Sequence, residues 1–182
     1  HFNPASMLTS LGSTLTITNG TIDLSSGEAV NVATLNLSNG TLTGSDIVTV
    51  NGTFNWTSGW MSGTGATNIP AGRTLNLATV SYPYLDGRTL NNSGTAIFTG
   101  AYGLSLYNGA VFNNLGSLTV QSDLYIYSSG TVTFNNSGSF IKSAGTGTRL
   151  SEALERASRT VRRRSLIFLI SDFLQDEGYE NA

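Results

Sequence analysis

Apolar and polar residues alternate in short runs throughout residues 1–148. The runs at 14–18 (Thr-Leu-Thr-Ile-Thr), 34–38 (Thr-Leu-Asn-Leu-Ser) and 131–134 (Thr-Val-Thr-Phe) are apolar at every second position. Successive side chains of a β-strand point to opposite faces, so this period of two predicts strands with one buried face and one solvated face. We therefore expect residues 1–148 to be all-β.

These runs recur at a nearly constant interval. The sequence Asn-Asn-x-Gly occurs at 91–94, 113–116 and 135–138, which are 22 residues apart, and each copy precedes a short β-type run. Asn-Gly-Thr at 19–21 returns 20 residues later at 39–41. A repeat of this length suits one coil of a β-solenoid, in which equivalent residues stack on one another. The interval predicts about six or seven parallel coils over residues 1–148.

The main alternative fold is an antiparallel sandwich of hairpins. Asn-Gly occurs at 19–20, 39–40, 51–52 and 108–109, and this dipeptide favours the two-residue turns of hairpins. A sandwich does not require a constant register of 20–22 residues between unequal strands, whereas stacked coils do. The repeat therefore favours the solenoid.

Residues 149–182 follow a different pattern. Apolar residues recur at helical spacing in 150–161, and the apolar run 165–171 then predicts a buried strand. This segment also holds twelve of the chain's twenty Lys, Arg, Asp and Glu residues. We expect a short helix-strand tail that forms a separate unit from the repeats.

Charge and hydropathy exclude some classes of function. The net charge is -2 and only 11% of residues are charged, so no broad basic surface for nucleic acid is expected. The longest apolar stretch, 166–170, is far shorter than the roughly 20 residues of a membrane-spanning helix, so no membrane insertion is expected. Cysteine is absent, which excludes disulfides and thiolate metal sites.

The segments 51–65 and 85–94, rich in Gly, Asn, Ser and Thr, resemble the repeats of large bacterial adhesin-like surface proteins. The resemblance covers nearly all of 1–148. It implies a right-handed parallel β-helix on a secreted or cell-surface bacterial protein. Such β-helices include inert stalks as well as polysaccharide lyases and hydrolases, so the resemblance specifies architecture rather than ligand.

The segment 162–180 resembles a fragment of a DUF58-type von Willebrand factor A-like domain. The resemblance places Asp172 near that family's metal site, but the Asp-x-Ser-x-Ser loop that supplies most ligands is missing here. The join of two families near residue 148 is compatible with a gene fusion, a misassembled sequence or an engineered chain. We predict that the tail packs on the last coil as a cap, because an open coil end leaves strand edges and core exposed.

Charged residues offer few candidates for catalysis. A polysaccharide lyase on this fold would pair acidic calcium ligands with a basic residue that removes a proton. The charged residues suited to these roles are Asp46, Asp86, Asp123, Arg73, Arg88 and Lys142. They are sparse, and the segment 86–88 (Asp-Gly-Arg) is simply interpreted as a turn with an exposed Arg88.

Two further catalytic arrangements are weak. Asp23 and Asp46 are 23 residues apart, close to one coil, so they could form the carboxylate pair of a glycoside hydrolase, but nothing else in the sequence supports one. His1 is the single histidine, and a copper site of its amine and imidazole would need a second one. We therefore predict no catalytic residues, no metal and no cofactor.

Aromatic residues provide a better functional candidate. Leu124 and Ile126 are expected to face the core, which turns Tyr125 and Tyr127 outward. The residues predicted to form an outer aromatic row are Trp56, Trp60, Tyr84, Tyr107, Tyr125 and Tyr127. Such rings can stack on sugars, or they can serve only to stabilise the solenoid.

The sequence thus favours a non-catalytic structural or adhesive segment that contacts glycans through its aromatic residues. The competing interpretation is a polysaccharide-degrading enzyme, a lyase or glycoside hydrolase, on the same scaffold. A groove that brings acidic residues together with Arg or Lys would favour the enzyme.

Overall fold

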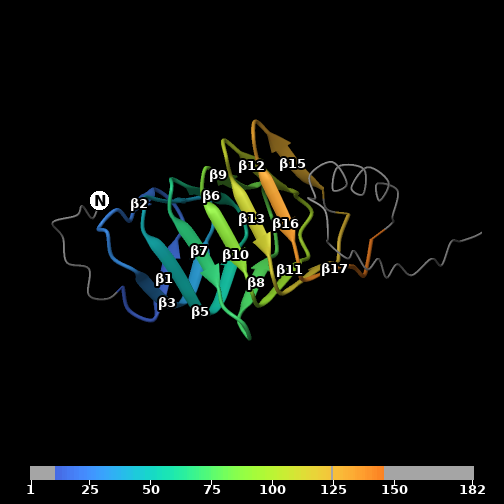
Figure 1. The fold of residues 1–182 in the computed structure, drawn as a ribbon, viewed down its shortest axis with the longest axis horizontal. Helices are drawn as coiled ribbons and strands as arrows, with labels where there is room; N and C mark the ends of the chain where they lie inside the picture. Colours follow the sequence, from blue (N-terminus) through green and yellow to red (C-terminus); the bar gives the residue numbers. More distant parts are fainter. Residues whose placement is uncertain (1–10, 124, 146–182) are drawn as a thin grey trace, which may run out of the picture.

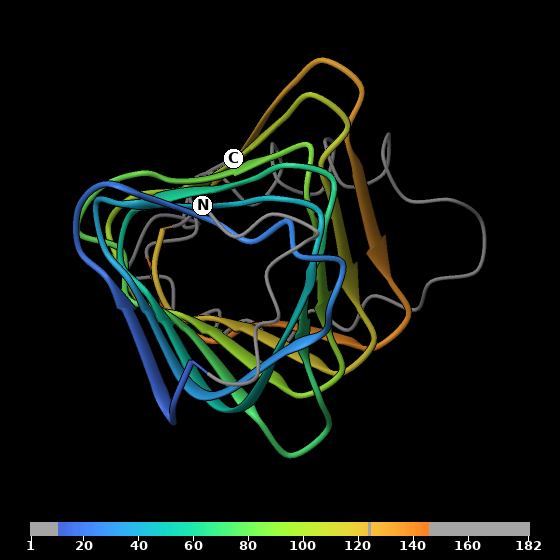
Figure 2. The ribbon, with the colours of Figure 1, turned by 90° about the vertical axis from the view of Figure 1, so that its left-hand side faces the viewer.

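The computed structural model describes residues 11–123 and 125–145. These residues form a parallel β-solenoid, and all of their strand pairs are parallel. The coils follow one another along the long axis in chain order (Figure 1), and an end-on view shows them superimposed around a common interior (Figure 2). The predicted parallel β-helix is confirmed, and the hairpin alternative is wrong.

The smaller of two sheets supplies one side of every coil. Its six strands indicate about six turns, as the repeat length predicted. In chain order they are β2 (Thr21–Asp23), β4 (Thr41–Thr43), β6 (Gly59–Ser62), β9 (Pro83–Asp86), β12 (Leu104–Tyr107) and β15 (Ile126–Ser129).

The larger sheet supplies the other two sides, because two of its strands are long enough to turn a corner. Those strands are β3 (Val30–Leu37) and β5 (Ile47–Trp56). One flank continues in β7 (Ala66–Ile69), β10 (Thr89–Asn92), β13 (Val111–Asn114) and β16 (Thr133–Asn136). The other consists of β1 (Thr14–Ile17), β8 (Thr74–Leu77), β11 (Thr95–Phe98), β14 (Ser117–Val120) and β17 (Ser139–Lys142).

The core consists of columns of apolar side chains, one from each coil. Leu15, Leu35, Phe54 and Leu75 are paired in register on successive strands, and each is at most 8% exposed. Full burial of such a side chain stabilises the fold by roughly 1.5–3 kcal/mol. The alternation of apolar and polar residues therefore builds a continuous interior along the stack.

The Asn-Asn-x-Gly repeat builds two ladders of hydrogen-bonded amides. The second Asn of each copy points inward, and the Nδ2 atom of Asn92 donates to Asn114 at 2.8 Å, while that of Asn114 donates to Asn136 at 2.6 Å. The first Asn points outward, where Asn113 donates to Asn91 and Asn135 donates to Asn113. The predicted stacking of equivalent residues on successive coils is confirmed for these asparagines.

The glycine of the repeat allows successive coils to approach closely at the corner between the two flanks. A Cβ atom at Gly116 would overlap the carbonyl oxygen of Gly94, and one at Gly138 would overlap that of Gly116. Any side chain there would push the coils apart, so the repeat needs glycine for steric reasons.

The predicted tail, its boundary at residue 148 and its role as a cap lie outside the described residues, as do His1 and Asp172. No helix that could cross a membrane occurs in the part of the chain that the structure describes.

Candidate functional site

Seven aromatic side chains gather over the smaller sheet. They are Trp60, Tyr82, Tyr84, Tyr102, Tyr107, Tyr125 and Tyr127. We call this set the aromatic cluster, and it includes six of the chain's seven tyrosines. Trp60, Tyr102 and Tyr127 expose 39%, 39% and 42% of their surface. This group of large, partly exposed rings is therefore the candidate surface for contact with another molecule.

Strand alternation places the cluster on the outer face of the sheet. Met61 and Leu85 are fully buried, so their neighbours Trp60 and Tyr84 point outward. Trp60 pairs in register with Tyr84. The stacking of coils therefore brings together residues that are 24 positions apart in the sequence.

The rings of this outer row contact one another across the strands. Trp60 and Tyr84 are stacked, with centroids 4.2 Å apart and planes inclined by 14°. The Tyr107 ring lies 6.1 Å from that of Tyr84 and 5.8 Å from that of Tyr127. Such offset and tilted contacts stabilise aromatic pairs and hold the rings in place.

A second group of rings comes from the segments just before β9, β12 and β15. The Tyr82 ring packs edge-on against Tyr102 at 5.1 Å. The Tyr125 hydroxyl donates a hydrogen bond of 2.8 Å to the Tyr82 hydroxyl, which links two residues 43 positions apart. The segment that carries Tyr102 is fixed by Thr79, whose hydroxyl donates to the carbonyl oxygen of Tyr102 and accepts from its N–H.

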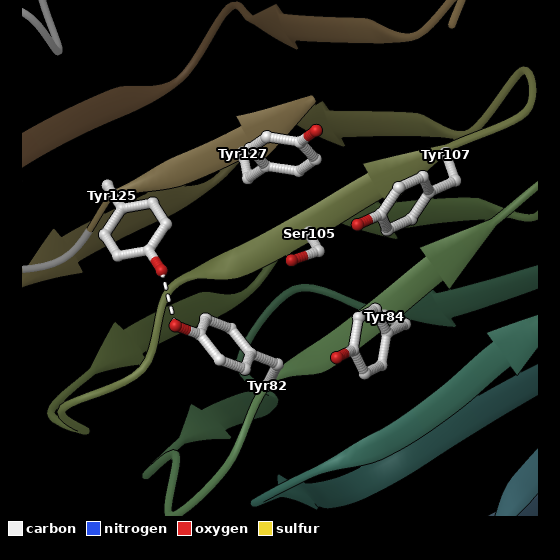
Figure 3. A pocket seen from close by; sticks show the side chains of 6 residues that line it. All are labelled: Tyr82, Tyr84, Ser105, Tyr107, Tyr125 and Tyr127. Carbon is white, nitrogen blue, oxygen red and sulfur yellow. Dashed lines mark hydrogen bonds between the residues drawn. The ribbon is translucent and has the colours of Figure 1, made fainter. Parts of the chain in front are cut away.

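An open hollow of about 220 Å³ lies within the cluster (Figure 3). Its lining consists of Tyr82, Tyr84, Ser105, Tyr107, Tyr125 and Tyr127. Ser105 occupies the middle of this group in Figure 3, with the five tyrosines around it.

The structure places most of the predicted aromatic residues together and corrects one of them. Trp60, Tyr84, Tyr107, Tyr125 and Tyr127 all belong to the cluster. Ile126 packs against the core as predicted, whereas Leu124 lies outside the described residues.

The prediction that Trp56 belongs to the outer row is wrong. Trp56 is fully buried in β5 and stacks on Phe54 at 5.7 Å, because both residues occupy inward positions of that strand. Its indole N–H has no hydrogen-bond partner among the described residues.

Two members of the cluster, Tyr82 and Tyr102, were missed by sequence reasoning. Tyr82 lies two positions before Tyr84 and could have been found from that spacing, since the buried Pro83 marks the inward position between them. Tyr102 lies outside the regular strands, so no periodic signal marks it.

The prediction that Arg88 is exposed in a turn is also wrong. Arg88 is fully buried, and its guanidinium occupies the interior near the corner that precedes β7 and β10. Its Nε atom donates to the Thr67 hydroxyl at 3.0 Å. The Nη atoms donate to the backbone carbonyl oxygens of Gly44, Asp46, Ser62 and Ala66. Burial lowers the Arg88 pKa to about 10, against the opposing effect of Asp46. This side chain links successive coils and is not positioned as a surface base.

Asp46 is only 3% exposed, and its carboxylate is hydrogen-bonded to backbone N–H groups. Its carboxylate accepts hydrogen bonds from the N–H groups of Ser26 and Gly27 and from the Ser26 hydroxyl. Burial alone would raise the Asp46 pKa, but these hydrogen bonds and the Arg88 charge together hold the pKa below its ordinary value of 3.8. Asp23 instead accepts a hydrogen bond from the Ser25 hydroxyl.

The remaining charged candidates have separate surroundings. Asp86 accepts a hydrogen bond from the Asn108 amide, and Asp123 lies 3.8 Å from Lys142. Arg73 is exposed. Among the described residues there is no group of three or more His, Cys, Asp or Glu side chains that could hold a metal ion.

Comparisons of this chain with protein-family models, with curated proteins and with solved structures find no match. The interpretation of function therefore rests on the aromatic cluster and its hollow.

Proposed function

We propose that the chain is a structural or adhesive segment of a secreted or cell-surface bacterial protein and that it binds glycans without cleaving them. The aromatic cluster carries this proposal. Tyrosine and tryptophan rings offer large flat contact areas that stack on sugar rings, and they lose little conformational entropy on binding. Their fixed positions on a rigid sheet reduce the cost of binding further.

The charged residues favour binding over catalysis. Arg88 and Asp46 are engaged in the interior, so neither is oriented toward the aromatic hollow to serve as an acid or base. The lining of the hollow consists of tyrosine and serine side chains. These groups can orient a sugar through hydroxyls and ring faces, and they do not supply the paired carboxylates of glycoside hydrolysis.

A panel of soluble and insoluble polysaccharides tests the proposal when retained protein and released sugar ends are scored in the same samples. We expect the protein to be retained on at least one polysaccharide and no sugar ends to be released. Trp60→Ala or Tyr127→Ala should weaken binding roughly tenfold, which corresponds to about 1.4 kcal/mol. Leu115→Ala is a matched control, since Leu115 is 56% exposed and lies outside the aromatic cluster.

Each other outcome contradicts the proposal. Released sugar ends that disappear in Asp86→Ala or Asp123→Ala would establish the enzyme on the same scaffold. Retention that is unchanged in both aromatic variants would show that the cluster only stabilises the solenoid.

A further inference from the structure

The aromatic column of the smaller sheet contains one gap. Strand pairing aligns Trp60 with Tyr84, Tyr84 with Ser105, and Ser105 with Tyr127. Ser105 thus occupies the position of a ring, and it is only 3% exposed beneath the tyrosines around it. Tyr107 leaves that position open, because it lies two residues farther along the strand and is paired with Asp86.

The strand spacing at this gap matches one additional ring. Tyr84 and Tyr127 lie on the strands that flank β12, so their backbones are separated by two strand spacings, about 9–10 Å. A ring in contact with aromatic carbons on both sides needs about 7–8 Å, which is twice the usual contact distance. The backbone spacing therefore suits a single six-membered ring between the Tyr84 and Tyr127 positions.

The remaining walls limit the ligand to one sugar unit. Tyr107 closes one end of the gap, and the hydrogen-bonded pair Tyr82 and Tyr125 closes the other (Figure 3). The hollow of about 220 Å³ is smaller than the roughly 300 Å³ at which sites for drug-sized ligands begin. An extended chain or a flat crystalline fibre would meet only the rims of the walls, whereas the end of a chain can enter.

The polar groups of the hollow suit a neutral polyol. The Ser105 hydroxyl lines the hollow, and Ser105 lies amid the tyrosines in Figure 3. The Tyr82 hydroxyl accepts from Tyr125, and its own proton remains available to a ligand. None of the described lining residues is charged, so a carboxylate or sulfate would be desolvated there without a counter-charge.

We infer that the hollow over Ser105 holds a single neutral pyranose ring that ends a glycan chain, stacked between Tyr84 and Tyr127. This inference rests on the proposed glycan binding and specifies its ligand. The Ser105 and Tyr82 hydroxyls orient the ring, the tyrosine walls admit one ring at the end of a chain, and the lack of a counter-charge disfavours charged sugars.

Binding of small probes to the full chain tests this inference. The probes are the methyl glycosides of glucose, galactose and mannose, together with methyl glucuronide and phenol, and binding is followed by ligand-observed NMR. We expect at least one neutral glycoside to bind in the millimolar range and the glucuronide to bind at least tenfold more weakly. Glucuronide binding of equal strength, or binding of phenol alone, would overturn the inference.

Ser105→Phe and Ser105→Ala form a matched pair. The phenylalanine ring fills the gap and should abolish glycoside binding, whereas alanine keeps the gap open and should reduce affinity only severalfold. Thermal melting of both variants verifies that they fold. If Ser105→Phe does not fold, Tyr82→Phe is tested in its place, since this variant keeps the aromatic ring and removes one hydroxyl. Tyr82→Phe should weaken glycoside binding severalfold. Unchanged glycoside binding in this variant would count against the inference.

The outcomes also separate this inference from glycan binding in general. A folded Ser105→Phe variant that is retained on polysaccharide like the wild type, without a glycoside signal in either protein, would overturn the inference and leave the proposed function standing. Absence of binding to any polysaccharide or glycoside in the wild type would overturn both.

Discussion

At the scale of single residues, Arg88 is the most unusual side chain of the interior. A guanidinium carries five N–H donors, and here they are directed to the Thr67 hydroxyl and to four backbone carbonyl oxygens. The acceptors lie up to 44 positions earlier in the sequence, so one side chain connects three successive coils. These five hydrogen bonds explain why the fold tolerates a buried cation there, since the guanidinium finds an acceptor in each direction that it donates.

Arg88→Met should therefore destabilise the fold strongly. The substitution keeps a long side chain but removes all five hydrogen bonds of the guanidinium, and each buried acceptor that thereby loses its donor costs about 1–3 kcal/mol. We expect a loss of at least about 3 kcal/mol in the free energy of unfolding, measured by urea denaturation. Arg73→Met is the control, because Arg73 is exposed and its replacement should cost less than about 0.5 kcal/mol. Equal costs for the two variants would contradict a structural role for Arg88.

The lowered pKa of Asp46 predicts that the stability of the fold depends on pH, in a direction that follows from the sign of the shift. A carboxyl whose pKa is lower in the folded state than in the unfolded state stabilises the fold above the unfolded value, here 3.8, and this contribution is lost as the pH falls through the folded value. The free energy of unfolding of the wild type should exceed that of Asp46→Asn by about 1–3 kcal/mol at neutral pH. This difference should become smaller as the pH is lowered. Urea midpoints over a series of pH values measure it. A difference that is constant with pH would contradict this assignment, and Asp86→Asn provides the control.

At the scale of elements, each Asn-Asn dipeptide divides its two amides between different environments. Asn113 belongs to the outer ladder, whereas Asn114 is 1% exposed and also donates to the carbonyl oxygen of Ser139. The inner ladder begins at Asn92, which is aligned with Ile69 in the preceding coil, and its Oδ1 atom has no partner among the described residues. The ladder thus stabilises the coils that contain the repeat and ends where the repeat ends.

The two amides of one dipeptide should therefore differ in their contribution to stability. Asn114→Ala removes a buried link of the inner ladder and leaves polar partners above and below it unsatisfied, which we expect to cost about 2–4 kcal/mol. Asn113→Ala affects a solvated ladder and should cost less than about 1 kcal/mol. Denaturation midpoints of the two variants, which change the same residue type in the same strand, measure the contrast. A reversed order would mean that the outer ladder is the stabilising one.

The sequence predicted the stacking of coils but not the contents of every inward position. A 22-residue interval fixes which residues are neighbours on adjacent coils, so the Asn ladders followed directly from Asn113 and Asn135. The alternation of faces holds only within a strand and is reset at each corner, so the orientation of Arg88 after the turn at Gly87 could not be read from its neighbours. Trp56 was misplaced for a different reason: it was assigned to the surface because it is aromatic, although it lies two positions after Phe54 and shares the inward face of that strand.

The hollow at Ser105 could not be predicted because serine carries no aromatic signal. Only the strand pairing shows that Ser105 occupies a ring position between Tyr84 and Tyr127. Tyr82 and Tyr125, which close the hollow, are joined by a contact across 43 residues that no local pattern contains.

At the scale of the whole molecule, each coil contacts mainly the coil before it and the coil after it. The stability of such a stack is approximately a sum of terms for single coils and for interfaces between neighbours. A central coil has two interfaces and an end coil has one within the described stack. Opening is therefore expected to begin at the ends and to spread inward.

Hydrogen exchange should show that protection of backbone amides increases from the ends of the stack to its centre. Two Leu→Ala variants in the same core column test the cause of this difference. Amides of β5, β8 and β11 should exchange more slowly than those of β1 and β17, because central strands open only after their neighbours. Leu75→Ala removes a fully buried side chain with coils on both sides and should cost about 2–5 kcal/mol, with protection lowered in the flanking coils. Leu15 is 8% exposed in the first described coil, so Leu15→Ala should cost less and affect mainly β1 and β3. If both variants lowered protection uniformly along the chain, the stack would unfold as one cooperative unit, and the nearest-neighbour description would be wrong.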